Sequence, residues 1–579
     1  MRRLGSTLVA LLLTAGFLQA CGTTGDQAAD SGDQAFRRLA TEILDYTYRQ
    51  NPSNATHLGI HTYDDLIPDY SAAAVTANVE AVKSYRARLD GIDASTLTLD
   101  AQLDLEQTKH ALDGMLLREQ VIRPWAKNPD TYSSGITNDA YVMISRSFAP
   151  PEQRLRSLTS RLKLMPAALA HARENLDDSP RIYTQVAIDQ VDGNRHFFAH
   201  DVPAAFAGVK DPALLAEFGK ANDAVVTALS DYKAWLENDL LPRSNGSFAY
   251  GAETYRKVLD ADEMITTPLP DLLSVANEDL ARNQKAFTEA ARQIDPAKAP
   301  FDVLADVQKD FPPASDLLAA TQENLDSLAQ FVREKQIVDV PPAPPAKVVE
   351  TPPFMRATTS ASMDIPGPFE KAATEAYFNM TLPDPSWPKD EQDEFMSQWY
   401  RPSISNVSVH EVWPGHYLQF LYAKDYPSDV RKVFGATSNF EGWAHYCEQM
   451  MLDEGLHADD PRYRLAQVQD ALLRDVRFIV GIKMHTEGMT VEQAQRMFVE
   501  QAYQPEPVAE SEAKRGTSDA TYGYYTMGKL AILKLRDDYR KAVGDAFSLK
   551  AFHDAFVRIG PLPLPLIRKV MLGQTGDLF

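Results

Sequence analysis

The chain has 579 residues and a formal net charge of −22 at pH 7, from 58 basic and 80 acidic residues. A surface this acidic repels the phosphate backbone of nucleic acids, so we expect no DNA or RNA partner. The apolar fraction of 44% is ordinary for a globular protein, and the length is sufficient for a substantial core.

The N-terminus has the pattern of a secretory signal. A basic start, Met1-Arg2-Arg3, precedes an apolar run over residues 8–18, which is shorter than the roughly 20 residues needed to span a bilayer. The run ends in Leu18-Gln19-Ala20-Cys21, which resembles the bacterial lipobox, in which lipid is attached to the cysteine thiol. We therefore expect residues 1–20 to be a lipoprotein signal peptide and Cys21 to carry a membrane anchor. The alternative is an ordinary signal peptide followed by a chance cysteine.

The residue after this cysteine bears on location. Gly22, rather than Asp, follows Cys21, and by resemblance to the bacterial sorting pattern this favours the outer membrane, facing the periplasm. Lipidation of Cys21 leaves Cys447 as the only thiol, so no intramolecular disulfide can form and the fold depends on its core. No later segment has the length and hydropathy of a membrane span.

The remaining chain is predicted to be mainly helical. Residues 21–35 are mostly small and polar, which is typical of a flexible tether, and helical periodicity begins at Phe36. Helical patterns recur over residues 76–120, 151–178, 210–240 and 270–335, and again from residue 404 to a helix near 522–541. We expect one large helical domain over residues 36–579, with an N-terminal helical part, 36–340, and a second part, 341–579.

The segment where these parts meet changes character. The Pro-rich runs at residues 340–346 and 351–353 cannot lie inside a helix. Residues 346–380 contain short β-like stretches and form either a linker or a small sheet with an exposed edge. We favour the sheet, and place it near the active centre, because the next segment carries the chemistry.

One short motif suggests a metal site. In His410-Glu411 followed by His416, two imidazoles could bind zinc while the glutamate acts as general base on the metal-bound water. Such histidines are usually four residues apart; here the spacing is six, which on an ideal helix places the rings about 120° apart. Pro414 and Gly415 can distort the helix, and a bulge there would bring His416 back beside His410. The alternative is a Pro-Gly turn flanked by two unrelated histidines.

A second segment, residues 440–448, supplies carboxylates. Glu441, 25 residues after His416, is well placed as the third ligand, as in zinc peptidases whose glutamate ligand comes from a later helix. Glu448 lies seven residues on, on the same helical face, and could orient a histidine through its free ring N–H. A solvated helix face is the alternative, but the surrounding Trp, Tyr, Cys and Met indicate a buried helix, where a charge needs a partner.

Three further histidines are weaker candidates. His445 lies four residues after Glu441 and could also reach a metal. His196 and His200 are likewise four apart, but they lack an adjacent glutamate and a matching carboxylate segment, so we interpret them as a helical surface or core pair. Metal binding by any of the three stays open.

The two motifs together resemble a known family. His-Glu-x-x-Pro-Gly-His-x-x-Gln at residues 410–419 and Glu-Gly-Trp-Ala-x-Tyr-x-Glu at 441–448 are similar to motifs of the bacterial family called domain of unknown function 885, whose members are often lipoproteins. Blocks at residues 51–64, 477–494 and 525–536 match as well, so the resemblance spans nearly the whole mature chain. It implies a large, mainly α, zincin-like metallopeptidase fold of the gluzincin type.

The resemblance also assigns roles by motif position. These are the zinc ligands His410, His416 and Glu441, the general base Glu411, and two candidates for polarising a carbonyl and stabilising an oxyanion, His485 and Tyr525. The sequence departs from the family's pattern at His445, Gly481, Met489 and residues 519–522. These departures concern the substrate pocket and leave the metal ligands intact.

We therefore expect a zinc-dependent peptidase that hydrolyses amide bonds of short peptides at the cell envelope. An extended peptide would pair with the strand near residues 377–381. The alternative is a non-catalytic lipoprotein that binds peptides or envelope components around a structural metal, with His445 as fourth ligand. A helical scaffold without metal would leave the charges of Glu411 and Glu441 unexplained. The sequence does not determine the substrate, exo- or endo-cleavage, or the oligomeric state.

Overall fold

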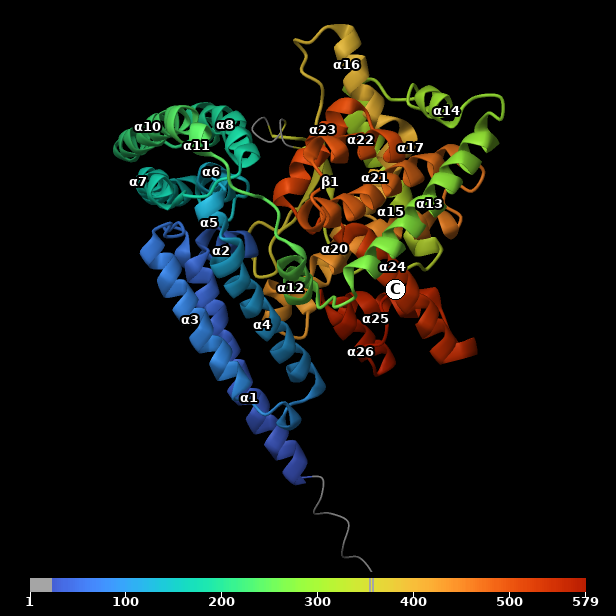
Figure 1. The fold of residues 1–579 in the computed structure, drawn as a ribbon, viewed down its shortest axis with the longest axis horizontal. Coiled ribbons are helices and arrows are strands. Elements are labelled where there is room, and N and C mark those ends of the chain that lie inside the picture. The colour runs from blue at the N-terminus through green and yellow to red at the C-terminus, as the bar shows by residue number, and fades with distance from the viewer. Residues whose placement is uncertain (1–22, 353–355, 357–358) are drawn as a thin grey trace, which may run out of the picture.

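The computed structural model describes residues 23–352, 356 and 359–579, with the backbone alone for residues 23–31. The expected signal peptide and the lipidation site Cys21 lie outside the described residues. The described chain is mainly helical with one small sheet, as the sequence predicts (Figure 1).

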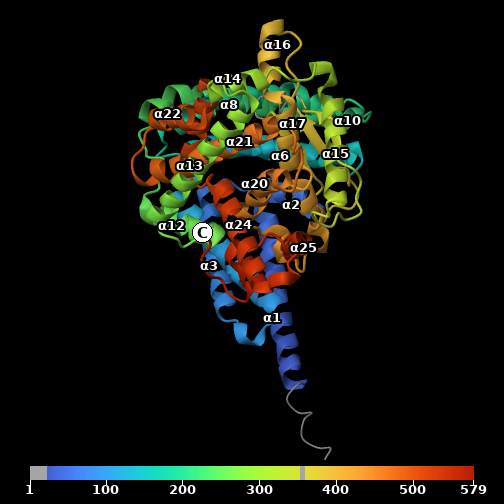
Figure 2. The same cartoon turned by 90° about the vertical axis from the view of Figure 1, so that its right-hand side faces the viewer.

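The first helix begins earlier than expected. We predicted a flexible tether over residues 21–35, but α1 (Thr23–Gln50) is helical from Thr23. Asp33 attaches the helix to the body, because its buried carboxylate accepts hydrogen bonds from the backbone N–H and the hydroxyl of Thr98, at 3.0 and 2.7 Å. The helix is therefore packed before Phe36, while its N-terminal end projects from the body (Figures 1 and 2).

The helices before the sheet cover the predicted blocks and also occur between them, most clearly over residues 130–144, 181–196 and 252–263. They are α1, α2 (Pro52–Leu58), α3 (Ala72–Asp90), α4 (Leu99–Leu117), α5 (Pro124–Lys127), α6 (Asp130–Ile144), α7 (Pro151–Asn175), α8 (Arg181–His196), α9 (Val202–Ala205), α10 (Pro212–Trp235), α11 (Leu241–Arg243), α12 (Ala252–Glu263), α13 (Leu269–Ile294), α14 (Pro300–Val307) and α15 (Leu317–Glu334). The pattern over residues 76–120 is two helices, because Gly91 follows α3 and Thr98 caps α4.

The predicted small sheet has three strands, β1 (Lys347–Glu350), β2 (Ala361–Asp364) and β3 (Tyr377–Met380), in the order β1-β3-β2. β1 pairs with β3 in parallel and β2 pairs with it antiparallel. β3 is therefore the central strand and both of its edges are occupied. The prediction that a peptide adds to the strand at residues 377–381 is wrong for this reason; the free edges belong to β1 and β2.

The helices after the sheet carry the candidate site. They are α16 (Lys389–Met396), α17 (Arg401–Glu411), α18 (His416–Leu421), α19 (Asp429–Val433), α20 (Thr437–Asp453), α21 (Pro461–Thr486), α22 (Val491–Ala502), α23 (Glu506–Ser518), α24 (Tyr524–Val543), α25 (Leu549–Ile559) and α26 (Leu564–Leu572). One large apolar core joins these helices, except α19, to α12–α15, so these four helices pack with the second part, although they precede residue 341. The apolar residues of α19 pack instead with α1, α3 and α4. α20, α21 and α24 lie near the middle of the molecule (Figure 2).

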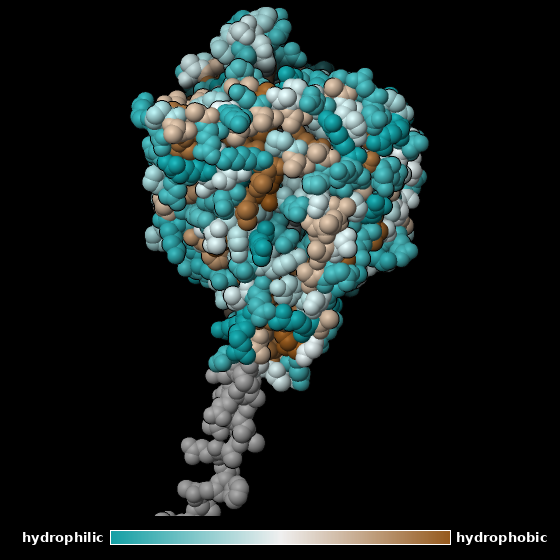
Figure 3. Space-filling model, turned by 90° about the vertical axis from the view of Figure 1, so that its left-hand side faces the viewer, coloured by the Kyte–Doolittle hydropathy of each residue, from teal (hydrophilic) through white to brown (hydrophobic). Residues whose placement is uncertain are grey.

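One face of the molecule is mostly hydrophilic (Figure 3). Figure 3 shows this face, on which apolar residues form small patches within a polar surround. Among the described residues, no helix combines the length and hydropathy needed to cross a bilayer.

Candidate metal centre

The two motif histidines lie on different helices. His410 is next to last in α17, and His416 is the first residue of α18, so the expected bulge is a complete break between two helices. Gly415 makes the break possible, because a Cβ at this position would lie 1.7 Å from the carbonyl oxygen of His410. The chain turns sharply enough to bring the two imidazole rings to a centroid separation of 4.8 Å.

Glu441 joins the two histidines. The Nε2 atoms of His410 and His416 are each 3.4 Å from Oε2 of Glu441. Ligand atoms of the three residues all lie within 4.8 Å of one another, and among the described residues this is the group that could hold a metal ion. The structure thus brings together the three residues that the motifs indicate as candidate ligands.

The donor set fits a zinc ion. Oε2 of Glu441 is buried and accepts no hydrogen bond of ordinary geometry, although a buried carboxylate oxygen without a partner is costly. A cation held between this oxygen and the two imidazoles would satisfy it. Two histidines and one glutamate are also the protein ligands of catalytic zinc sites that keep a further position for water or substrate.

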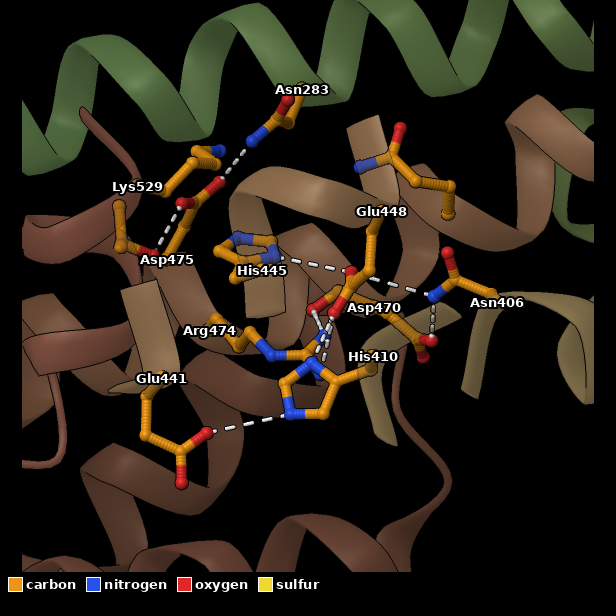
Figure 4. A network of polar contacts seen from close by, with 12 residues as sticks. Asn283, Asn406, His410, Glu441, His445, Glu448, Asp470, Arg474, Asp475 and Lys529 are labelled. Carbon is orange, nitrogen blue, oxygen red and sulfur yellow. Dashed lines mark hydrogen bonds and ion pairs between the residues drawn. The ribbon is translucent and has the colours of Figure 1, made fainter. Parts of the chain in front are cut away.

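A buried carboxylate orients His410 from behind. Oε1 of Glu448 lies 2.7 Å from Nδ1 of His410, and the same carboxylate contacts Nδ1 of His445 at 3.1 Å and Arg474 at 3.1 Å (Figure 4). The contact places the His410 proton on Nδ1 and leaves Nε2 free to face Glu441. Glu448 therefore has the orienting geometry that its spacing suggests.

The pKa values of His410 and Glu441 indicate which charge is stabilised between these residues. Burial opposes a charged imidazole, but the neighbouring carboxylates of Glu441 and Glu448 raise the pKa of His410 to about 9. Burial also opposes ionisation of Glu441, yet the neighbouring His416 and His410 hold its pKa well below the usual range. The carboxylates therefore stabilise positive charge here, which a proton or a metal ion can supply.

Glu411 and Tyr525 flank the ligands. Glu411 is half-buried and ends α17, immediately after His410. The Tyr525 ring, in the first turn of α24, stacks on the His410 ring with centroids 6.3 Å apart. Burial raises the pKa of Tyr525, so its hydroxyl remains a hydrogen-bond donor at neutral pH.

Two glycines bring the Tyr525 helix against the Glu441 helix. A Cβ on Gly528 would lie 2.0 Å from the carbonyl oxygen of Ser438, and one on Gly442 would lie 2.4 Å from Cα of Gly528. α20 and α24 can therefore approach backbone to backbone. This contact is what sets Tyr525 beside the ligands.

His485 lies elsewhere in the fold. Its Nε2 is 2.8 Å from the carbonyl oxygen of Gly516, and its ring packs against Phe248 and Tyr250. It is eleven residues beyond Arg474 on α21, which corresponds to roughly 16 Å along the helix axis. Of the two candidates that the resemblance suggests, the structure thus brings Tyr525 beside His410 and leaves His485 apart from it.

The other histidines also stay apart from the ligands. His445 is fully buried and bonded to Glu448, and it does not belong to the three-residue group. The rings of His196 and His200 lie 4.5 Å apart on the exposed side of a helix, and among the described residues no third ligand joins them.

The motifs alone miss Arg474 and Asp470. Arg474 contacts Glu448, while Asp470 accepts a hydrogen bond of 2.6 Å from Asn406 of the ligand-bearing helix α17 (Figure 4). Both lie on α21, a helix whose other residues in this stretch are largely buried. Two charged residues four positions apart in a largely buried helix could have identified this pair from the sequence, because buried charges need partners.

Comparisons with known proteins agree on the fold. A model of the family described as "Bacterial protein of unknown function (DUF885)" matches residues 52–571. A solved structure from Shewanella oneidensis, described as a lipoprotein of unknown function, is 26% identical with a TM-score of 0.79, over 93% of this chain and 99% of that one. Another from Colwellia psychrerythraea, also described as a lipoprotein, is 17% identical with a TM-score of 0.77, over 94% and 98%. No curated protein matches.

Proposed function

Because the chain belongs to the bacterial family DUF885, whose description gives no activity, we propose a function from the site itself: zinc-dependent hydrolysis of amide bonds in short peptides. The observation that carries the proposal is the convergence of His410, His416 and Glu441, with ligand atoms within 4.8 Å of one another and Glu411 next in sequence to the first of them. The proposed fold type is the zincin-like one.

Each side chain of the site has its own role in the proposed reaction. His410, His416 and Glu441 would hold the zinc, which when bound supplies a Lewis acid for the scissile carbonyl and lowers the pKa of water. Glu411 takes a proton from the attacking water and delivers it to the leaving amine nitrogen. The Tyr525 hydroxyl donates a hydrogen bond to the oxygen that becomes negative during attack.

We also propose a lipid anchor on Cys21 that places the enzyme at the cell envelope, on the periplasmic face of the outer membrane. Support comes from the Leu18–Cys21 ending and from the similar solved structure that is described as a lipoprotein. The alternative of a structural metal in a binding protein has less support. It calls for a fourth protein ligand, and His445 is instead bonded to Glu448.

The test compares two variants with the wild type. Glu411→Gln should keep near-stoichiometric zinc and lose about 10²- to 10⁴-fold in turnover, the usual cost of losing a general base. Glu441→Ala should lose zinc as well as activity. Zinc content and cleavage of a short-peptide library, with and without chelator, are measured side by side. Glu454→Gln, an exposed change at the end of α20, is the control.

Two outcomes would contradict the proposal. Full turnover by Glu411→Gln would remove its role as base. A wild-type protein that binds no zinc would remove the peptidase altogether.

A further inference from the structure

Three guanidinium groups gather on Tyr525. The Cζ atoms of Arg474 and Arg477 lie 5.6 and 5.3 Å from the centroid of its ring. Arg515 lies close by, because the Asp519 oxygen that it contacts is 3.3 Å from the hydroxyl of Tyr524, whose ring stacks on that of Tyr525 with centroids 5.0 Å apart. They come from α21 and α23, so the packing of these helices against α24 creates the cluster. In a chain with a net charge of −22, such a concentration of positive charge beside the candidate centre calls for a role.

Two of the three arginines already have largely buried carboxylate partners. Arg474 contacts Glu448, behind the metal ligands. Arg477 uses its Nε and Nη2 atoms on the two carboxylate oxygens of Glu512, both at 2.7 Å, in a fork geometry that satisfies both groups.

Arg515 is the accessible member. Its Nε and Nη2 both contact one oxygen of Asp519, at 3.1 and 2.9 Å, and its side chain is 37% exposed. The same Asp519 oxygen also lies 3.3 Å from the hydroxyl of Tyr524. Arg515 therefore keeps one side of a planar five-donor group for a further acceptor, next to Tyr525.

We propose that Arg515 binds the terminal carboxylate of the substrate, so that the enzyme acts on peptides with a free C-terminus and cleaves near that end. The inference rests on the proposed peptidase. An extended peptide spans roughly 3.5 Å per residue, so a carboxylate held beside the stacked Tyr524 and Tyr525 rings lies a short way along the peptide from a bond held next to the His410 ring, on which Tyr525 stacks. A planar guanidinium suits a carboxylate because it can donate two parallel hydrogen bonds.

The experiment pairs each peptide acid with its C-terminal amide. Wild-type enzyme should favour the acid by about 10- to 100-fold in kcat/KM, the range expected for a hydrogen bond to a charged group. Arg515→Gln should lose this preference through a higher KM for the acid, with the amide unaffected. Arg256→Gln, at an exposed arginine on α12, should keep it. Zinc-loaded Glu411→Gln should bind the acid more tightly than the amide, a measurement that needs no turnover.

Three results would overturn the inference. One is equal handling of acid and amide by the wild type, in cleavage and in binding to Glu411→Gln. Another is an equal loss of kcat on both peptides in Arg515→Gln, which would mean that Arg515 acts through Tyr525. The third is an amidated peptide ending in Glu that performs as well as the acid, because the recognised carboxylate would then be a side chain. All three leave the proposed peptidase intact, whereas its failure appears as a lack of zinc or of any cleavage.

Discussion

Oε1 of Glu448 lies 2.7 Å from Nδ1 of His410, and the Glu448 side chain is completely buried. This single contact sets which nitrogen of His410 carries the proton and which way the ring faces. The carboxylate also contacts Arg474 and His445, and these two further contacts hold it in place. The orientation of His410, a proposed metal ligand, thus depends on a residue outside the proposed ligand set.

Replacing this carboxylate should weaken zinc binding without removing a ligand. We expect Glu448→Gln to lower zinc affinity by about 10- to 100-fold, the usual cost of losing a carboxylate that orients a ligand histidine. Competition with a chromophoric chelator measures the affinity. Glu454→Gln at the exposed end of the same helix should be neutral, and an unchanged affinity in Glu448→Gln would show that the contact does not tune the site.

The glycine contact between α20 and α24 should tolerate no side chain. In Gly528→Ala the new Cβ would meet the carbonyl oxygen of Ser438 at 2.0 Å, so the helices must separate. Overpacking of this kind costs about 1–3 kcal/mol, and Tyr525 should move away from the ligands. We expect a lower midpoint in chemical denaturation and reduced activity.

Gly219→Ala is the matched control. It lies within α10 and has no atom within 4 Å of a built Cβ, so it should stabilise slightly. A Gly528→Ala protein as stable and active as the wild type would contradict the close approach.

His61 should make stability depend on pH. Its two ring nitrogens lie 3.0 Å from Asp64 and 3.2 Å from Glu370, so a protonated ring bridges the N-terminal helices to the segment between β2 and β3. Burial opposes the charge, but the two carboxylates raise the pKa of His61 above its usual 6.5. The bridge therefore contributes fully below that value, and its contribution is lost as the pH rises through the raised pKa.

The difference in stability between wild type and His61→Asn should consequently be largest near pH 5–6 and shrink towards pH 9. We expect a maximum of about 1 kcal/mol, because the side chain is partly exposed. Denaturation midpoints across this range measure it. A difference that does not change with pH would mean that His61 is neutral in the fold.

Glu263 should also make the protein less stable as the pH rises, but for a different reason from His61. Its buried carboxylate accepts hydrogen bonds from the backbone N–H groups of Thr437 and Ser438, at 3.0 and 3.1 Å, and so caps the helix that carries Glu441. Burial raises the pKa of Glu263 to about 7 from 4.5. The ionised form is thus penalised in the fold, and stability should fall between pH 4.5 and 7 by up to about 3 kcal/mol. Glu263→Gln should abolish this slope in denaturation experiments, whatever its effect on absolute stability.

Much of the site could be predicted from the sequence, because the information is local. Helical class follows from apolar periodicity, and the small sheet from a Pro-bounded β-like stretch. His410, Glu411 and His416 lie within seven consecutive residues, and Glu441 and Glu448 share one helical face. Such patterns indicate which residues are close in the sequence and which of them share one face of a helix.

Only the tertiary structure decided how these pieces meet. The pairing of both edges of β3, the distance of His485 and the gathering of arginines on Tyr525 all depend on contacts between residues far apart in sequence. Neither periodicity nor spacing encodes them, since a contact such as Gly442 against Gly528 exists only when two helices pack to a particular distance. That packing is selected by the close-packed core as a whole, in which each helix position depends on all of its neighbours.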